Sequence, residues 1–321
     1  MTSVVEESVV LVNANGEDLL DSMDEYNRRR PRMDMNPTGG NDREQVLGYL
    51  HVDAFIKNML DARALLTAFD IGMIDCLANQ QCITSHALQE KLGIGDTAMR
   101  FMLGLLISNN VIEQSNGELK LTLSFKKALR YRDLLELKLV ICQLAAHDLM
   151  DFFNEFISSP PNFIQKSRFF RLFDYSRCFE DHPENRRMTE RWMRITTTLT
   201  KYEAQVCMKY HDFSKYRYMM DIGGNSGEFA LRICKEHPQL MATVVDLPLV
   251  CDIGRKHISA HPEDNRIQFV KADALKDDLP KGFDLVTFKS ILHDWPEEVA
   301  RHLIERGTQS LKPGGTLLIF E

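Results

Sequence analysis

Residues Met219–Glu228 have the sequence MMDIGGNSGE, and this stretch decides the fold class. Its apolar start predicts a buried strand, and the glycines that follow predict a tight turn into a helix. A ligand can approach the backbone closely at Gly223, Gly224 and Gly227, because glycine has no Cβ. The first N–H groups of the helix face the same point and have no partners within it. The stretch therefore predicts either a site for a nucleotide-like ligand or a plain strand–helix turn.

A second predicted strand, at residues 242–246, ends in Asp246. This acid lies 19 residues after Gly227, an offset at which a carboxylate can accept hydrogen bonds from both hydroxyls of a ribose. Glu228 stands beside the turn, where its charge would repel a pyrophosphate but suit a sulfonium or an ammonium group. Together these acids favour S-adenosylmethionine over a nicotinamide dinucleotide.

Composition narrows the class of protein. The chain has 321 residues, 44% of them apolar, which is enough for two domains with large cores. A net charge of −7 gives no reason to expect nucleic acid or an anionic membrane as the main partner. There is no visible signal peptide and no apolar run of the ~18 residues that a membrane helix needs. Seven cysteines without a C-x-x-C pair indicate reduced thiols in a cytoplasmic protein, and the scattered histidines predict no metal site.

The N-terminal half divides into two predicted regions. Residues 1–45 are polar and predict a flexible arm. Residues 46–133 predict three helices and a hairpin around Asn116-Gly117, which is the order of a winged-helix unit. The last of these helices carries only Arg100 as a basic residue, so a dimerisation module is favoured over a DNA-binding one.

Helix ends in this region also have sequence signals. Thr84 is a predicted N-cap, and Gly93 is predicted to end the same helix. Asp96 is predicted to cap the next helix.

Residues 134–212 predict a helical linker that is interrupted at Pro160-Pro161. The region is rich in aromatic and apolar side chains, and Trp192 and Met193 are among them. These side chains either form a core between domains or line an apolar pocket for the acceptor beside the cofactor.

Residues 213–321 alternate between strand and helix patterns, which predicts a Rossmann-like parallel sheet, an α/β fold. The expected strand order is 3-2-1-4-5, and the link Asp273–Gly282 can cross the sheet without a helix. The expected strands lie near 218–222, 242–246, 267–272, 283–289 and 316–320, and the expected helices near 228–237, 249–259 and 296–311.

Three polar residues follow the third and fourth strands. Asp273 is placed either to contact an adenine amino group or to cap the loop after it. His293 has no structural reason to stand at a strand end, and an imidazole that titrates near pH 6.5 can take a proton from an acceptor hydroxyl. Asp294, just before Pro296, is predicted to cap the following helix.

These motifs together resemble the small-molecule O-methyltransferases of the caffeic acid/hydroxyindole type, which plants, animals and bacterial antibiotic pathways share. The resemblance covers about residues 45–321, including a winged-helix dimerisation domain. The segments that carry it are Asp221–Gly227, Val245–Pro248, Ala272–Asp273, Leu292–Trp295 and Leu311–Gly315.

The resemblance implies roles for individual residues. His293 would be the general base and Glu321, 28 residues later, would orient it. Asp294, Trp192 and Met193 would contact the acceptor. S-adenosylmethionine, which leaves as S-adenosylhomocysteine, would be bound by Gly223, Gly224, Gly227, Asp246, Leu247, Asp273, Ala274 and Lys289.

The predicted function is therefore an S-adenosylmethionine-dependent O-methyltransferase that acts on a small aromatic hydroxyl metabolite as a cytoplasmic homodimer. The family continues past the fifth strand, whereas this chain stops at Glu321. That departure raises an alternative: a non-catalytic or split subunit in which a partner chain covers the exposed edge of the fifth strand.

Overall fold

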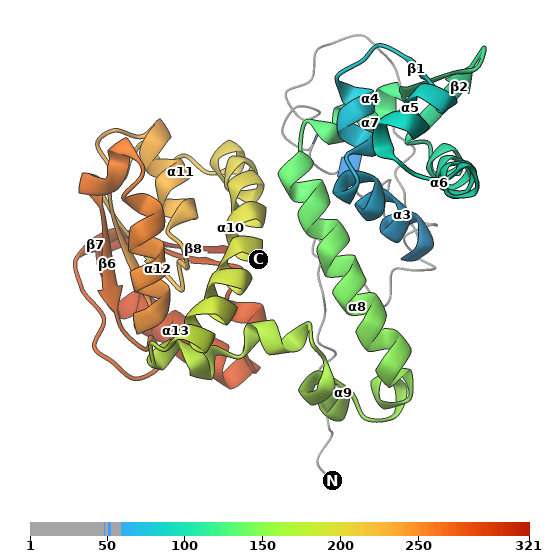
Figure 1. Ribbon diagram of the computed structural model, residues 1–321. Helices are drawn as coiled ribbons and strands as arrows, with labels where there is room; N and C mark the ends of the chain where they lie inside the picture. Colours follow the sequence, from blue (N-terminus) through green and yellow to red (C-terminus); the bar gives the residue numbers. More distant parts are fainter. Residues whose placement is uncertain (1–47, 49–50, 53–58) are drawn as a thin grey trace. The chain divides into compact units, whose positions relative to one another are not determined.

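The computed structural model describes residues 48, 51–52 and 59–321 (Figure 1). The chain divides into two compact units between Tyr202 and Glu203, within a long helix, α10 (Pro183–Tyr210), whose end belongs to the second unit. We call them the helical unit, which ends at Tyr202, and the sheet unit, Glu203–Glu321. The predicted arm over residues 1–45 lies outside the described residues. The boundary predicted after residue 212 falls inside the sheet unit, and the predicted domain roles stay predictions.

The helical unit is mainly α-helical, as expected, and carries one small antiparallel sheet with the strand order β1-β3-β2. Its long helix α8 loses helical geometry at Phe152 and ends at Ser158, just before the two prolines that were predicted to interrupt it. No helix in the described part of the chain is both long enough and apolar enough to cross a membrane. The elements are α3 (Met59–Asp70), α4 (Met73–Ala78), β1 (Ile83–Thr84), α5 (Ser85–Leu92), α6 (Asp96–Ser108), β2 (Ile112–Ser115), β3 (Glu118–Leu121), α7 (Leu123–Leu129), α8 (Arg132–Ser158), α9 (Pro160–Lys166), two short 3-10 helices (Phe170–Phe173 and Tyr175–Phe179) and α10 (Pro183–Tyr210).

Two of the three predicted helix-end signals in this unit are confirmed. The Thr84 hydroxyl accepts a hydrogen bond from the backbone N–H of Ala87 at 3.2 Å, and Gly93 ends α5 in the left-handed conformation. The prediction for Asp96 is wrong, because α6 begins at Asp96 and Gly95 takes the N-cap position. An acid in the first turn of a helix still stabilises it through the helix dipole.

The predicted hairpin is confirmed between β2 and β3. Asn116 and Gly117 both have positive φ angles, 52° and 81°. Two successive left-handed residues form the turn that matches the twist of paired strands.

The sheet unit contains five parallel strands in the order β6-β5-β4-β7-β8, which confirms the predicted order. The described residues from Asp273 to Gly282 contain no helix, as expected. The elements are β4 (Tyr218–Ile222), α11 (Glu228–Glu236), β5 (Met241–Asp246), α12 (Pro248–Ile258), a 3-10 helix (Pro262–Arg266), β6 (Ile267–Lys271), β7 (Phe283–Lys289), a 3-10 helix η5 (Leu292–Asp294), α13 (Glu297–Gln309) and β8 (Leu311–Phe320).

Strand β8 begins five residues earlier than the predicted start at residue 316. Leu311 pairs with Phe283, but the next paired residue is Thr316, which lies opposite Leu285. The residues between them form a bulge that contains Gly314 with a φ of 78°. The glycines that suggest a loop in the sequence are thus part of an irregular strand.

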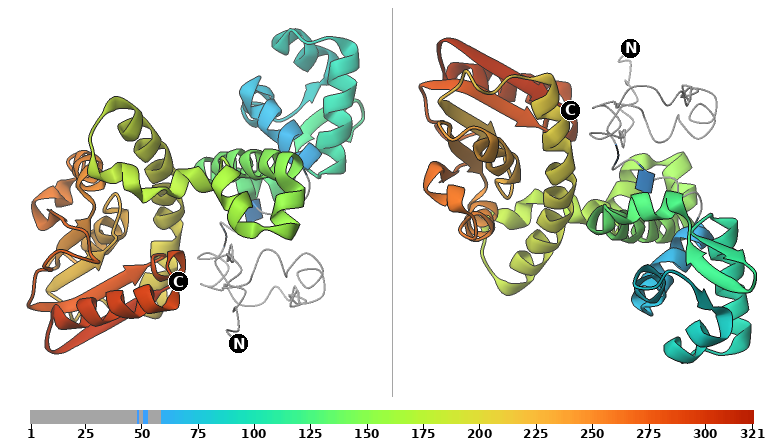
Figure 2. Two further views of the ribbon diagram at one scale, coloured as in Figure 1. Left: turned by 90° about the horizontal axis from the view of Figure 1, so that it is seen from below. Right: turned by 90° about the horizontal axis from the view of Figure 1, so that it is seen from above.

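Each face of the sheet carries its own apolar core. Met219 and Leu285 pack on one face with α11, α12 and the last turns of α10. Met220 and Val286 point to the other face, where they pack with Leu303 of α13. Helices therefore cover both faces (Figures 1 and 2), and the ends of the strands are left for the functional site.

Gly254 of α12 should be intolerant of a side chain, since a Cβ there would lie 2.6 Å from Phe269 and 2.9 Å from the backbone oxygen of Asn225. We expect Gly254→Ala to lower the free energy of unfolding by about 1–3 kcal/mol. The control is Gly104→Ala in α6, where a Cβ meets nothing within 4 Å and the change should stabilise the helix by up to about 1 kcal/mol. Thermal unfolding of both variants tests this, and a Gly254→Ala protein that melts no earlier than the wild type would contradict the packing.

Candidate functional site

The glycine turn after β4 has the conformation that its sequence predicts. Gly223, Asn225 and Gly227 all have positive φ angles, between 54° and 75°. The N–H of Gly223 donates to Val245 O at 2.8 Å, which joins the turn to strand β5. A Cβ on Gly223 would lie 2.5 Å from the Ile291 side chain. The Ile291 side chain therefore packs directly against the backbone of the turn, which leaves no room for a side chain at Gly223.

Asp246 at the end of β5 holds this turn in place. Its carboxylate accepts hydrogen bonds from the N–H of Asn225 at 2.8 Å and from the N–H of Leu247 at 2.7 Å. Burial raises the pKa of this carboxyl to about 6. An ionised carboxylate has about four acceptor positions. The two that remain can receive the hydroxyls of a ribose.

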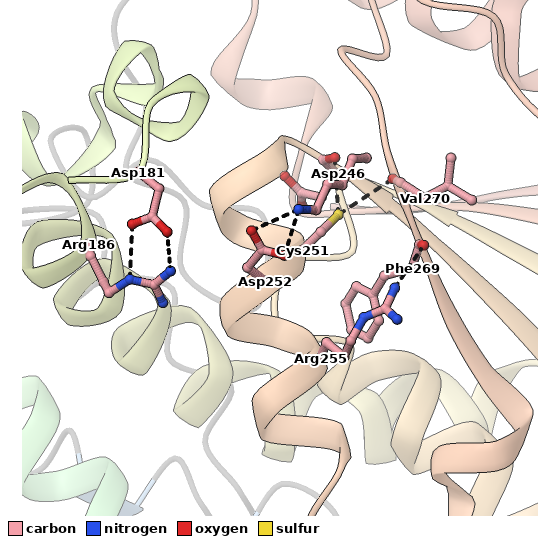
Figure 3. A network of polar contacts seen from close by, with 9 residues as sticks. Asp181, Arg186, Asp246, Cys251, Asp252, Arg255, Phe269 and Val270 are labelled. Carbon is pink, nitrogen blue, oxygen red and sulfur yellow. Dashed lines mark hydrogen bonds and ion pairs between the residues drawn. The ribbon is translucent and has the colours of Figure 1, made fainter. Parts of the chain in front are cut away.

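Hydrogen bonds and an ion pair connect helix α12 to the ends of β5 and β6 next to Asp246 (Figure 3). The Cys251 thiol lies 3.2 Å from Asp246 O and 3.5 Å from Val270 O, and Asp252 pairs with Lys271. Burial raises the pKa of Cys251 to about 12, so the thiol remains a hydrogen-bond donor at neutral pH. The helix thus fixes the backbone that carries the Asp246 carboxylate.

A second carboxyl, Asp221, is fully buried under the turn. One of its oxygens accepts a hydrogen bond from the Thr287 hydroxyl at 2.6 Å, and the other has no hydrogen-bond partner among the described residues. A Cβ on Gly224 would lie 2.6 Å from that second oxygen. Burial raises the pKa of Asp221 to about 7.

Glu228 is used differently from the sequence expectation. Its buried carboxylate accepts from Arg232 at 2.7 Å and pairs with His257 of α12 at 2.8 Å. Burial raises the pKa of Glu228, but these two partners outweigh burial and hold the pKa below its ordinary value. The charge of Glu228 is therefore compensated between α11 and α12, and it ties these helices together.

His293 lies in η5, directly after β7, and is positioned by Glu321. Glu321 pairs with His293 Nδ1, and its other oxygen accepts from the N–H groups of Ile291 and Leu292 at 3.0 and 2.8 Å. The hydrogen bond to Glu321 raises the pKa of His293. The imidazole is 39% exposed. Its Nδ1 is thus engaged by the carboxylate, as in a catalytic base that is held in one tautomer.

Asp294 does not cap the following helix, which corrects the sequence prediction. The N-cap of α13 is Pro296, without a side-chain cap. The Asp294 carboxylate lies instead 3.4 Å from His293 Nε2.

Lys289, at the end of β7, pairs with Glu203 in the last part of α10. The sequence gives no signal for Glu203, because it lies 86 residues before Lys289 and only the packing of α10 on the sheet brings the two together.

The remaining predicted residues have structural partners whose relation to a ligand is untested. Asp273 accepts from the N–H of Leu275 at 3.0 Å and pairs with Lys276, which supports the loop-capping alternative. Ala274 packs against the core beneath α13. Trp192 and Met193 are buried in the helical unit, and their roles stay predictions.

The structure therefore brings the predicted residues together in two groups within the sheet unit. The glycine turn, Asp246 and Leu247 form one group, and His293, Asp294 and Glu321 form the other.

Comparison with known proteins identifies the family. Residues 160–321, half of the chain, match the O-methyltransferase domain family. The chain belongs to this family. Membership confirms the predicted class of enzyme, an S-adenosylmethionine-dependent methyltransferase of the O-methyltransferase type, and the predicted cofactor.

Relatives of this O-methyltransferase have known activities. The chain is 29% identical to the 3-hydroxy-5-methyl-1-naphthoate 3-O-methyltransferase of Streptomyces sahachiroi, over 81% of this chain and 73% of that protein. It is 35% identical to the acetylserotonin O-methyltransferase of Bos taurus, over 38% of this chain and 34% of that protein.

Solved structures share the fold. The mitomycin 7-O-methyltransferase superposes with a TM-score of 0.63 at 19% identity, covering 87% of this chain and 81% of that one. Human N-acetylserotonin methyltransferase, solved in complex with S-adenosylmethionine, gives a TM-score of 0.57 at 19% identity over 89% of this chain and 81% of that one. Both superpositions confirm the predicted α/β methyltransferase fold, in which a helical N-terminal part precedes the parallel sheet.

The buried Asp221 should make stability depend on pH. The carboxyl group has a pKa of 3.8 in the unfolded chain, and burial raises this pKa to about 7 in the folded one. Between these two pH values the folded state binds more protons than the unfolded state, so the free energy of unfolding falls as pH rises. We expect Asp221→Asn to raise the melting temperature, relative to the wild type, more at pH 8 than at pH 5. The control is Asp278→Asn, a change at an exposed position. Its melting temperature should differ from that of the wild type by the same amount at pH 5 and at pH 8. An equal effect of both variants would contradict the account.

Proposed function

We propose that the chain methylates a hydroxyl group of a small aromatic compound, with S-adenosylmethionine as methyl donor and His293 as general base. The observation that carries the proposal is the pairing of His293 with Glu321 beside the carboxyl ends of β4 and β7. The names of the relatives support the acceptor class, since the naphthoate and acetylserotonin enzymes both act on aromatic compounds.

The residues of the glycine turn are suited to hold the cofactor. Side chains are excluded at Gly223 and Gly224, and Asp246 keeps free acceptor positions for ribose hydroxyls. Leu247 and Asp273 lie at neighbouring strand ends. When bound, S-adenosylmethionine supplies an electrophilic methyl group on a sulfonium.

His293 acts on the acceptor. Its Nδ1 is occupied by Glu321, so the proton of the acceptor hydroxyl goes to Nε2. The Glu321 carboxylate then stabilises the imidazolium that forms. Asp294, 3.4 Å from Nε2, is placed to contact the same hydroxyl.

We assign Trp192 and Met193 to contact with the acceptor, as the resemblance to the family implies. Both side chains are buried in the helical unit, and the ring of Trp192 packs against that of Tyr175 with 5.2 Å between centroids. Aromatic surroundings of this kind suit an aromatic acceptor.

The protein acts as a cytoplasmic homodimer that associates through its helical unit. A hollow of about 410 Å³ between α3 and α8 supports association at this surface. Its lining includes apolar side chains, among them Leu66 and Leu139, and the polar side chains of Arg63, Gln143 and His147. Helix α8 also exposes three apolar side chains, those of Met150, which lines the hollow, and of Phe153 and Ile157 farther along the helix. The comparisons do not favour the alternative of a non-catalytic or split subunit.

His293→Ala should lower kcat by about 10²- to 10⁴-fold and leave the affinity for S-adenosylmethionine within about threefold, because the imidazole moves a proton and is not part of the turn. The assay follows methylated product by mass spectrometry with a panel of phenols and naphthols. His302→Ala on α13 is the matched control and should keep full activity. A His293→Ala enzyme with wild-type turnover would end the assignment of the base.

The pH dependence of kcat/KM should report the Glu321–His293 pair. The base works when neutral, so the rate of the wild type falls as pH drops below the raised pKa of His293, above 6.5. Glu321→Gln removes the charge that raises this pKa, so the acid limb should move to lower pH while the plateau falls at least about tenfold. An acid limb that stays in place or moves to higher pH would contradict the pairing.

A further inference from the structure

Helix α12 packs directly against the second half of the glycine turn. A Cβ on Gly254 would lie 2.9 Å from the backbone oxygen of Asn225, and a Cβ on Gly227 would lie 3.2 Å from the side chain of Ile258. Gly254 and Ile258 are spaced as i and i+4, so they lie on the same face of α12. Close packing of this kind lets a shift of one segment move the other.

His257, the neighbour of Ile258 in α12, adds a polar contact to this packing. Its Nε2 donates to Oε2 of Glu228, the residue that follows Gly227, at 2.8 Å. The Glu228 side chain is only 4% exposed, so its carboxylate depends on protein partners in place of water. Arg232 supplies the other partner, since its Nε donates to Oε1 at 2.7 Å.

The two partners of Glu228 fix different things. Arg232 lies one turn farther along α11, so its hydrogen bond joins two residues of the same helix. His257 belongs to α12, so its hydrogen bond fixes the first residue of α11 relative to a second helix. Without it, Oε2 would stay buried and unpaired, which favours a movement of the start of α11 toward water.

Such a movement would reach the rest of the turn through Gly227. The N–H of Gly227 donates to Gly224 O at 2.9 Å, and its own oxygen accepts from the N–H of Leu231 at 2.8 Å. Gly227 therefore connects the first turn of α11 to the first half of the glycine turn. The position of Glu228 and the conformation of the turn are thus coupled.

We propose that His257 is a positioning residue for the cofactor, which acts through Glu228 to hold the glycine turn in the conformation that binds S-adenosylmethionine. The proposal rests on the proposed function, because it takes the turn as the cofactor site. Since His257 acts through the backbone of the turn, it should affect the affinities for S-adenosylmethionine and S-adenosylhomocysteine to the same extent.

The test compares His257→Asn with His257→Gln in the full chain. The amide nitrogen of glutamine can take the place of Nε2, whereas the asparagine side chain is shorter by one methylene. Calorimetry at pH 7 gives the dissociation constants for both compounds. In His257→Asn both constants should rise about tenfold, and in His257→Gln both should stay within about threefold of the wild type.

Two further variants complete the test. Glu228→Asp keeps the charge but withdraws the carboxylate from His257, so both constants should rise as in His257→Asn, and this variant decides if His257→Asn does not fold. Lys312→Met is the control, because it removes the ion pair with Asp284 near the amino end of β7. Its constants should stay within about twofold of the wild type, whatever its melting temperature, because it lies away from the turn.

The failures of the two proposals are distinguishable. Wild-type constants in His257→Asn and Glu228→Asp would overturn the role of His257 and leave the proposed function intact. Equal losses of affinity in His257→Asn and His257→Gln would also overturn this role, because the N–H donor would then not be responsible. A wild type that binds neither compound would overturn the proposed function itself.

Discussion

The site depends on one carboxylate, that of Asp246, which joins two segments separated by a whole helix. It accepts the N–H of Asn225 in the turn after β4 and the N–H of Leu247 at the start of α12. Both segments lie at the carboxyl ends of neighbouring parallel strands, and such ends meet at one edge of the sheet. The carboxylate therefore connects the left-handed turn directly to the start of α12, in addition to the hydrogen bond from the N–H of Gly223 to Val245 O that joins the turn to β5.

Two effects control the charges of the acidic residues in the sheet unit: burial, which favours the protonated form of a carboxyl group, and ion pairs, which favour the ionised form. Asp221 is buried and Asp246 is half-buried, and burial raises the pKa of both, to about 7 and about 6. Glu228 and Glu203 are compensated by His257 with Arg232 and by Lys289. Two carboxylates face His293: Glu321 pairs with Nδ1, and Asp294 lies 3.4 Å from Nε2. Their negative charges favour the protonated form of the imidazole.

The sequence predicts those parts of the molecule that local patterns determine. The strand order, the glycine turn and the hairpin at Asn116-Gly117 follow from apolar runs and turn residues, whose conformations depend on near neighbours. The placement of His293 after β7 is of the same kind. Its contact with Glu321 follows from the resemblance to a family and not from spacing alone.

Other features depend on packing between distant segments. Glu203 meets Lys289 only because the end of α10 packs on the sheet, and nothing near Glu203 in the sequence marks it. Glu228 joins two helices because His257 lies opposite it on α12, and the sequence gives no sign of this pair. The sequence does not reveal that β8 begins at Leu311, because the bulge that follows contains glycines, which are typical of loops. The roles of Trp192 and Met193 depend on side-chain directions that periodicity does not determine.

The proposed cofactor site consists of the glycine turn and the end of β5. The most direct measurement is an NMR titration of the isotope-labelled chain with S-adenosylhomocysteine, which follows backbone amides that are assigned in advance. The account predicts saturable shifts of the amides of Gly223, Asn225 and Leu247, and no comparable shift of the hairpin amides of Asn116 and Gly117. Saturable binding that leaves the turn and Leu247 unshifted would contradict it.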